Sequence, residues 1–450
     1  MTAYYEQSRK LFSQNTKLSI EVDPKHPYVI AERNIDWDQL MREVEPVIYR
    51  GILSNIGRRL NIRAHCGIYL LQASCNWTDR QSEEMMRYHA PTRIFCGYAE
   101  SDTDWIDHTR IEKFRNKRLG KEGAEILNRY LLKTAKSHGF TNGKDVDSVR
   151  PMDTTVQESG ISYPTEMNLM KKFQERVKKI AAEILGNASD KLEELLELGK
   201  KTKEKVKEYQ FFAKAKEQKE DLLKEVMEIS GIFLEKLLSL SQLTEKVKGL
   251  RAYLRKEMEH LLEIMPTLLD QIKSWLETGQ VAADKILSLY KNIPHFIKKG
   301  KVGKPSEIGR KWIINQYTGG FLFVMAPENP VIADTDCVKI SLQESINTFG
   351  EIPDSFGTDR GMYSAENINL CKEYKIRKIG IQPRGQAEWE VDRDTARELY
   401  CRRAGIEPRI GVAGKLGLKK SRAKTDAGDI ISGQKAAIGF NLKKLMTCWA

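Results

Sequence analysis

Long apolar runs are absent from this chain of 450 residues. The longest, such as FLFVMA at 321–326, fall far short of the roughly 20 apolar residues that a membrane-spanning helix needs. The N-terminal MTAYYEQSRK also lacks the apolar core of a signal peptide. We therefore predict a cytoplasmic protein with no membrane partner.

Paired cysteines are absent as well. The seven cysteines are odd in number and widely dispersed, and no two form a CxxC pair. The seven histidines likewise form no HExxH or similar cluster. These patterns argue against a disulfide framework and against a zinc site.

Proline is scarce in the middle of the chain, where only Pro266 lies between Pro164 and Pro294. The block at 167–299 is rich in Lys, Glu and Leu, a composition typical of long helices. A coiled-coil-like seam, broken only at Ser230, runs through Leu223, Val226, Phe233, Leu237 and Leu240. We predict an antiparallel helical bundle in which Pro266 kinks or opens a helix. Its mixed charges favour a scaffold or dimer contact over a DNA contact.

Positive charge is present in excess, with a formal net charge of +12. Residues 400–450 hold 11 Lys and Arg against 3 Asp and Glu, so much of the excess lies in this segment. It includes Lys415, Lys419, Lys420 and Arg422. Such a cluster suits a polyanionic partner such as DNA. A solvated basic face is the alternative that charge alone leaves open.

Three residues of the same segment share one helical face. Tyr400, Arg403 and Glu407 stand at i, i+3 and i+7. A carboxylate beside a guanidinium and a phenol suits a site that holds a metal and clamps a phosphate. A salt bridge between Arg403 and Glu407 along their own helix is the structural alternative. We expect this helix to begin near Asp392, and Pro408 favours a kink or restart close to Glu407.

Two aspartates occur in strand-like contexts. The run VDSVRPMDTTV predicts a strand that carries Asp153 near its C-terminal end, then a turn at 158–160 and a short strand in ISYPT. IPDSFGTD predicts a second strand that delivers Asp359. Two Asp and one Glu from separate elements are the minimum set for a pair of Mg²⁺ ions that perform phosphoryl transfer.

The spacing of apolar residues distinguishes the remaining segments of the chain. Residues 1–35 show little periodicity, whereas 37–98 and 114–137 have helical spacing. The first third is therefore mostly helical and houses either a DNA-recognition module or a core and dimerisation domain. Near the other end we predict a hairpin from KWIINQY and FLFVMA, helices at 336–349 and 366–374, and a strand at KIGIQP.

Taken in order, several runs resemble the DDE transposases of bacterial insertion sequences, in the branch with a Tyr-x2-Arg-x3-Glu-x6-Lys signature. The resemblance covers most of 40–165 and 300–450 and includes LLQASCNWTDRQSEEMMRYHAPTRIFCGY, DHTRIEKFR, DTTVQESGISYPTE, GKPSEIG, GTDRGMYSAENI, RRAGIEPRIG and GFNLKKL. Tyr400, Arg403 and Glu407 match the signature. Lys415 lies eight positions after Glu407, where the signature has seven.

The resemblance implies a mixed fold. A helical N-terminal domain at 1–144, for DNA binding or dimerisation, would precede a ribonuclease H-like α/β catalytic domain. That domain would consist of 145–166 and 300–450, interrupted by the helical insertion at 167–299. Asp153, Asp359 and Glu407 would hold two Mg²⁺ ions, for which Mn²⁺ can substitute. Tyr400, Arg403 and the basic residues Lys415, Lys419, Lys420 and Arg422 would hold DNA.

The activity implied is that of a bacterial transposase. It would bind the terminal inverted repeats of its element, cut them and join them to target DNA. Its partners would be double-stranded DNA and a second copy of the chain in the synaptic complex, in the cytoplasm on the nucleoid. Two alternatives stay open: a metal-dependent nuclease of the same fold, and a catalytically inactive DNA-binding or scaffold protein. The intact carboxylates argue against the inactive protein, and the N-terminal runs argue against the nuclease.

Overall fold

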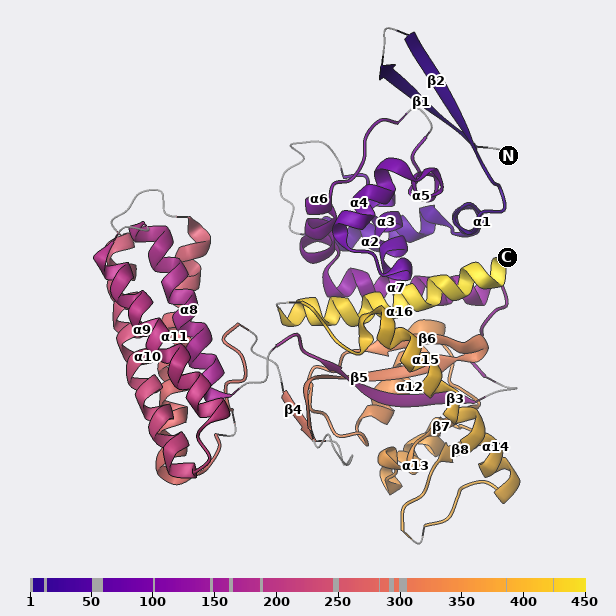
Figure 1. Cartoon of the computed structure of the whole chain (residues 1–450). Coiled ribbons are helices and arrows are strands. Elements are labelled where there is room, and N and C mark those ends of the chain that lie inside the picture. The colour runs from indigo at the N-terminus through magenta and orange to yellow at the C-terminus, as the bar shows by residue number, and fades with distance from the viewer. Residues whose placement is uncertain are drawn as a thin grey trace. The chain divides into compact units, whose positions relative to one another are not determined.

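The computed structural model in Figure 1 has a mixed α/β fold. It describes residues 3–11, 14–50, 60–99, 102–145, 149–161, 165–186, 189–245, 251–282, 284–290, 295–298, 306–385, 387–423 and 425–450. The chain forms two compact units, one from 1–160 with 295–450 and the other from 161–294. No helix among the described residues is both long and apolar enough to cross a membrane.

The first unit begins with elements that periodicity did not predict. Strands β1 (Ala3–Leu11) and β2 (Gln14–Val22) form an antiparallel hairpin, and α1 (Pro27–Asn34) follows. The strands AYYEQSRKL and QNTKLSIEV are largely polar, and apolar residues alternate with polar ones only over the last five residues of β2, Leu18–Val22. The usual sequence signal of a half-buried strand is therefore weak here.

The predicted helices of the first third are present. They are α2 (Trp37–Ile48), α3 (Ile62–Cys75), α4 (Asp79–Tyr88), α5 (Ala90–Phe95), α6 (His108–Lys113), the π-helix η1 (Phe114–Leu119) and α7 (Gly120–Ser137). Thr78 caps α4, because its side chain accepts from the Gln81 N–H while the Gln81 side chain accepts from the Thr78 N–H. These helices share one compact unit with the sheet described next.

The last helix, α16 (Asp426–Trp449), joins the helical layer to the sheet. It contacts α7, α3 and strand β6 (Phe321–Met325), and Figure 1 shows it lying alongside α7. At Gly439 an added Cβ would lie 2.1 Å from the backbone oxygen of Ala73. Only glycine therefore permits this close approach of α16 to α3.

The sheet has six strands in the order β4-β5-β3-β7-β8, with β6 paired to β5. The other strands are β3 (Arg150–Glu158), β4 (His295–Lys298), β5 (Ser306–Tyr317), β7 (Ser355–Thr358) and β8 (Lys378–Ile381). β5 runs antiparallel to β3, β4 and β6, whereas β3, β7 and β8 are parallel. The predicted β5–β6 hairpin and the strands β7 and β8 are confirmed. Ile313 belongs to one apolar core and Trp312 and Ile314 to another, as expected for a strand with both faces buried.

Helices connect the later strands. They are α12 (Cys337–Phe349), α13 (Ala365–Glu373), α14 (Arg393–Ala404) and α15 (Ile406–Ala413), with the short helices η2 (Thr318–Gly320), η3 (Arg360–Met362) and η4 (Gly414–Leu418). The helices predicted at 336–349 and 366–374 are thus confirmed as α12 and α13. The helix expected near Asp392 is confirmed as α14, which Asp392 caps through its side chain.

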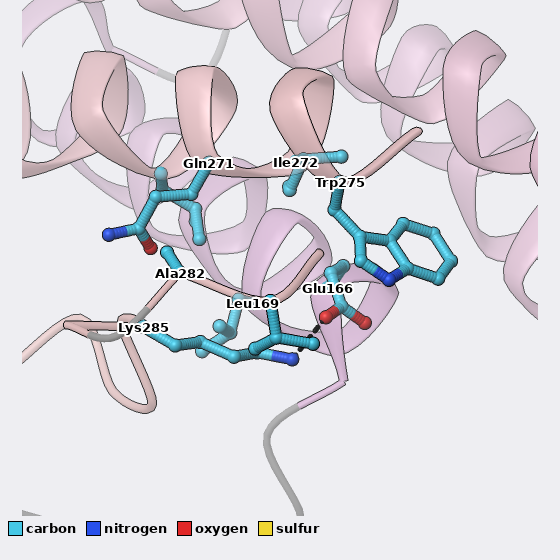
Figure 2. A pocket seen from close by; sticks show the side chains of 9 residues that line it. Glu166, Leu169, Gln271, Ile272, Trp275, Ala282 and Lys285 are labelled. Carbon is cyan, nitrogen blue, oxygen red and sulfur yellow. Dashed lines mark hydrogen bonds and ion pairs between the residues drawn. The ribbon is translucent and has the colours of Figure 1, made fainter. Parts of the chain in front are cut away.

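The second unit is helical, as its composition predicts. It consists of α8 (Glu166–Leu185), α9 (Asp190–Phe211), α10 (Lys216–Glu245) and α11 (Ala252–Thr278) around one apolar core. Every member of the predicted seam is buried, and the buried Ser230 donates to the Val226 carbonyl and accepts from Gln174. Pro266 lies inside α11 without ending it. Figure 2 shows Glu166 and Lys285 paired beside Trp275 in a small pocket of this unit.

Candidate functional site

Asp153 and Asp359 meet at the edge of the sheet where β7 ends. In the parallel pair of β3 and β7, Arg150 lies beside Phe356 and Pro151 beside Gly357. The same register, continued by two residues, brings Asp153 level with Asp359, the first residue beyond β7. Because neighbouring strands lie about 4.8 Å apart, the two residues reach the same edge of the sheet.

The position of Asp153 within its strand differs from the prediction. It is the fourth of nine residues in β3, rather than a residue near the C-terminal end. The reason is that β3 goes on pairing with β5, where Asp153 lies opposite Ile314, after β7 has ended. Asp153 therefore marks the end of the parallel pairing, not the end of the strand. The short strand predicted in ISYPT lies largely outside the described residues.

Asp359 is held by the turn that follows β7. It caps η3, and its Oδ1 accepts from the Gly361 N–H at 2.8 Å. Arg384, from the loop after β8, donates to the carbonyls of Arg360 and Gly361 at 2.6 and 2.7 Å. This arginine was missed by sequence reasoning, because an isolated basic residue in a loop carries no signal of such a role.

Glu407 belongs to a different helix from Arg403. α14 ends at Ala404 and α15 begins at Ile406, so the chain restarts its helix here, as the prolyl residue after Glu407 suggested. Tyr400, Arg403 and Glu407 nevertheless stay together. Arg403 Nη2 lies 3.5 Å from Glu407 Oε1, and the Arg403 guanidinium carbon lies 5.6 Å from the centre of the Tyr400 ring.

The charged side chains of the site affect the pKa of the Asp153 carboxyl group. The pKa of Asp153 is raised from its ordinary value of 3.8 to about 6, chiefly by burial. The charges of Asp359 and Glu407 raise it further, whereas the Thr154 N–H and the charge of Arg403 lower it. Groups that are 48 to 254 residues apart in the chain are thus brought into electrostatic contact. A partly buried carboxyl with a perturbed pKa, influenced by two further acids, is a candidate functional site.

The raised pKa of Asp153 predicts a pH-dependent cost to stability. A carboxyl whose pKa is higher in the folded than in the unfolded chain costs the folded state stability as pH rises from about 4 to about 6. Without divalent cations, Asp153→Asn should therefore be more stable than wild type at neutral pH, and this difference should shrink toward pH ~4. Denaturant unfolding across this range measures it, with Glu84→Gln, an exposed acid of α4, as the control. A difference that does not change with pH would contradict the assignment.

Arg403 and Glu407 differ in how firmly they are held. Arg403 is only 7% exposed, and within the described part of the chain its buried Nε has no hydrogen-bond partner. The side chain of Glu407 is 65% exposed, and its ion pair to Arg403 is the only one it forms with the residues that the structure describes. Arg403 therefore offers a fixed cationic donor, whereas Glu407 can turn at low cost, because an exposed ion pair stabilises little.

The three carboxylates supply the type of donor atom that Mg²⁺ binds. Oxygen donors are what Mg²⁺ prefers, and a bound cation would relieve the like charges that raise the pKa of Asp153. As the side chains lie, however, no three His, Cys, Asp or Glu residues of the described chain are grouped closely enough to hold a metal. Glu407 faces Arg403 instead, so completing a ligand set would require it to leave that partner.

Basic side chains line a cavity of about 370 Å³ next to β3. Lys415 and Lys419 face it together with Thr155, Glu158 and Glu307. The backbone of Glu158 donates to the Lys419 carbonyl at 2.9 Å and accepts from the Ser421 N–H at 2.8 Å. The exposed Lys419, Lys420 and Arg422 are thereby carried on a segment fixed to the end of the strand that bears Asp153. No role for Glu307 follows from its run GKPSEIG.

Other acids near the site have structural roles. Asp334 pairs with Lys311 at 2.8 Å and accepts from Thr154. Asp354 forms an ion pair with Arg377, and Asp392 caps α14. None of these three acts on the pKa of Asp153 as a leading cause, which sets them apart from Asp359 and Glu407.

Comparison with known proteins adds one finding. Residues 16–117 match the family model described as a transposase domain (DUF772). The match runs from β2 into η1 and supports a transposase family, and it does not include Asp153, Asp359 or Glu407. The searches of curated proteins and of solved structures returned no match.

Proposed function

We propose that this chain is a DDE transposase that cuts and joins DNA with two Mg²⁺ ions. The observation that supports the proposal is the register of β3 and β7, which brings Asp153 level with Asp359, together with the charge of Glu407 acting on Asp153. The transposase-domain match in the helical layer supports the same function independently, because it lies in a different part of the chain.

The order of elements supports a ribonuclease H-like catalytic domain. The expected order is strand with Asp, insertion, hairpin, helix, strand with Asp, helix, strand, and helix with Glu. The chain has β3, α8–α11, β4, β5–β6, α12, β7, α13, β8 and then α14–α15, so β4 is an additional strand before the hairpin. Asp153 lies within β3 where its parallel pairing with β7 ends, and Asp359 follows β7. Ligand and catalytic groups of α/β sheets commonly gather at such an edge.

Each residue of the site has a separate task in this proposal. Asp153 and Asp359 would hold the metal ions from two strands, and Glu407 would complete the set after leaving Arg403. Metal bound there would activate an attacking water or DNA 3′-hydroxyl and stabilise the leaving oxygen. Arg403, released from Glu407, would donate to the phosphate next to the scissile bond. Tyr400 lies beside Arg403 and is exposed, so it would also contact the DNA.

Double-stranded DNA is the proposed partner, with a second copy of the chain in the complex that holds both ends. Lys415, Lys419, Lys420 and Arg422 would bind phosphates beside the site, and the helices within 16–117 would contribute recognition or dimerisation. Incubation with Mg²⁺ and DNA that carries the repeats flanking this reading frame should yield cut ends and then joined products. Cutting without joining would favour the nuclease, and binding without cutting the inactive protein.

The basic cluster makes a second prediction. Replacing Lys419, Lys420 and Arg422 with Ala should weaken binding to all duplex sequences alike and reduce the salt dependence of log K by about one unit per cation. A titration of binding against salt measures the slope. The control is the exposed pair Lys339 and Lys372, replaced in the same way. An unchanged slope in the triple variant would show that this cluster is only a solvated face.

A further inference from the structure

The helical bundle exposes two adjacent phenylalanines at the turn between α9 and α10. Phe211, the last residue of α9, is 72% exposed, and Phe212 is 66% exposed. The other two phenylalanines of this unit, Phe173 and Phe233, are fully buried. Two adjacent exposed rings leave apolar surface in water, and burying that surface against a partner would be favourable.

Lysines surround this turn, although the bundle as a whole has mixed charge. Residues 200–219 contain 8 Lys and 3 Glu, whereas 190–199 and 220–229 each contain 4 acidic residues and 1 Lys. Lys207 and Lys214, on either side of the phenylalanines, are exposed. Positive charge is therefore concentrated around the aromatic pair and is replaced by negative charge along both helices away from it. A polyanion is the partner that this pattern fits.

The aromatic rings select among polyanions. A lipid surface usually takes the whole apolar face of an amphipathic helix. In α9 that face, which includes Leu192, Leu195 and Val206, is buried in the bundle core. Two rings at a turn instead suit nucleic-acid bases, because an aromatic side chain stacks on any exposed base or wedges between base pairs.

We propose that the α9–α10 turn is a second DNA-contact surface, which binds DNA where its bases are unpaired or unstacked. Lys207 and Lys214 contact the phosphates, and Phe211 and Phe212 stack on the bases. The exposure of the two rings and the charge around them support this surface directly. It rests on the proposed function only in taking DNA as the partner of this chain. It assigns a DNA contact to a block whose overall composition favoured a scaffold.

The test measures the binding of the full chain to two different DNAs. Fluorescence anisotropy measures binding to a perfect duplex and to the same duplex with a few unpaired nucleotides. Wild type should prefer the second DNA, and Phe211→Ala/Phe212→Ala should reduce that preference about ten- to a hundredfold while leaving duplex binding unchanged. The control is Tyr253→Ala, which removes an aromatic residue that is 47% exposed on α11 of the same unit.

Two further variants separate stacking from other contacts. Phe211→Leu/Phe212→Leu keeps apolar surface without a ring and should lose the preference as the Ala variant does. Lys207→Ala/Lys214→Ala should weaken binding to both DNAs and lower the salt slope by about two. Equal preference in wild type and the Ala variant would overturn the inference, as would a Leu variant that binds like wild type. The inference would also be overturned if the Ala variant lost binding to phosphatidylserine vesicles while its binding to both DNAs stayed as in wild type.

The outcomes also separate this inference from the proposed function. If wild type prefers unpaired DNA through the phenylalanines but never cuts DNA with Mg²⁺, the transposase proposal fails and the surface stands. If wild type cuts element ends and the Ala variant keeps the full preference, the surface fails and the transposase proposal stands.

Discussion

Cleavage at the element ends is expected to fall by orders of magnitude when Asp359 is replaced with Asn. The substitution preserves size and the hydrogen bond that the Gly361 N–H donates, but it removes the charge that would hold Mg²⁺. Without that metal neither the nucleophile nor the leaving oxygen is stabilised. Binding to the same DNA should survive, because the basic segment and the helical layer are untouched. A gel assay of cleavage beside a mobility-shift assay measures both quantities.

Asp153→Asn and Glu407→Gln should behave in the same way. Combining any two should add little, because residues that act as one unit are not additive. Glu366→Gln, an exposed acid of α13, is the matched control and should cut at the wild-type rate. Wild-type cutting by any one of the three site variants would remove that residue from the site.

The largest expected effect on stability comes from Arg150, at the start of the strand that carries Asp153. Its guanidinium pairs with Asp145, and neither side chain is exposed to solvent. Arg150 also donates to the Gly143 carbonyl and to Ser345, and Asp145 accepts from the Thr318 N–H at 2.8 Å. Arg150→Met would leave the buried Asp145 without its counter-charge, at a cost of about 3–5 kcal/mol in the free energy of unfolding.

Denaturant unfolding of the full chain measures this loss. Arg50→Met is the matched control, because Arg50 pairs with Glu122 at 2.7 Å on the surface, with both side chains at least half exposed. Its removal should leave the unfolding midpoint unchanged. If Arg150→Met were as stable as Arg50→Met, the buried pair would not anchor the start of β3.

Local chemistry explains which elements could be predicted. β7 and β8 are short segments bounded by turn residues, and the capping residue Asp392 indicates where α14 begins. The placement of Asp153 was wrong because it depends on where the pairing of β3 changes from β7 to β5. The sequence of one strand does not indicate which strands it pairs with. The hairpin β1–β2 was missed because its strands are mostly polar.

Some features of the site could likewise be predicted from the sequence, whereas others could not. Asp359 and Glu407 could be proposed from motifs, but their action on Asp153 depends on the parallel register. The salt bridge from Arg403 to Glu407 follows directly from helical spacing, even though the helix restarts between them. Arg384 and Glu307 could not be found, because their positions result from loop paths and a cavity rather than from a local pattern.

One measurement tests the central claim directly. Crystals of the chain with its terminal DNA and Mn²⁺, measured at the manganese absorption edge, locate the metal without any assumption about activity. We predict anomalous density in contact with the carboxylates of Asp153 and Asp359, and Glu407 turned away from Arg403. Manganese bound elsewhere, with these carboxylates free of metal, would contradict the proposed catalytic site.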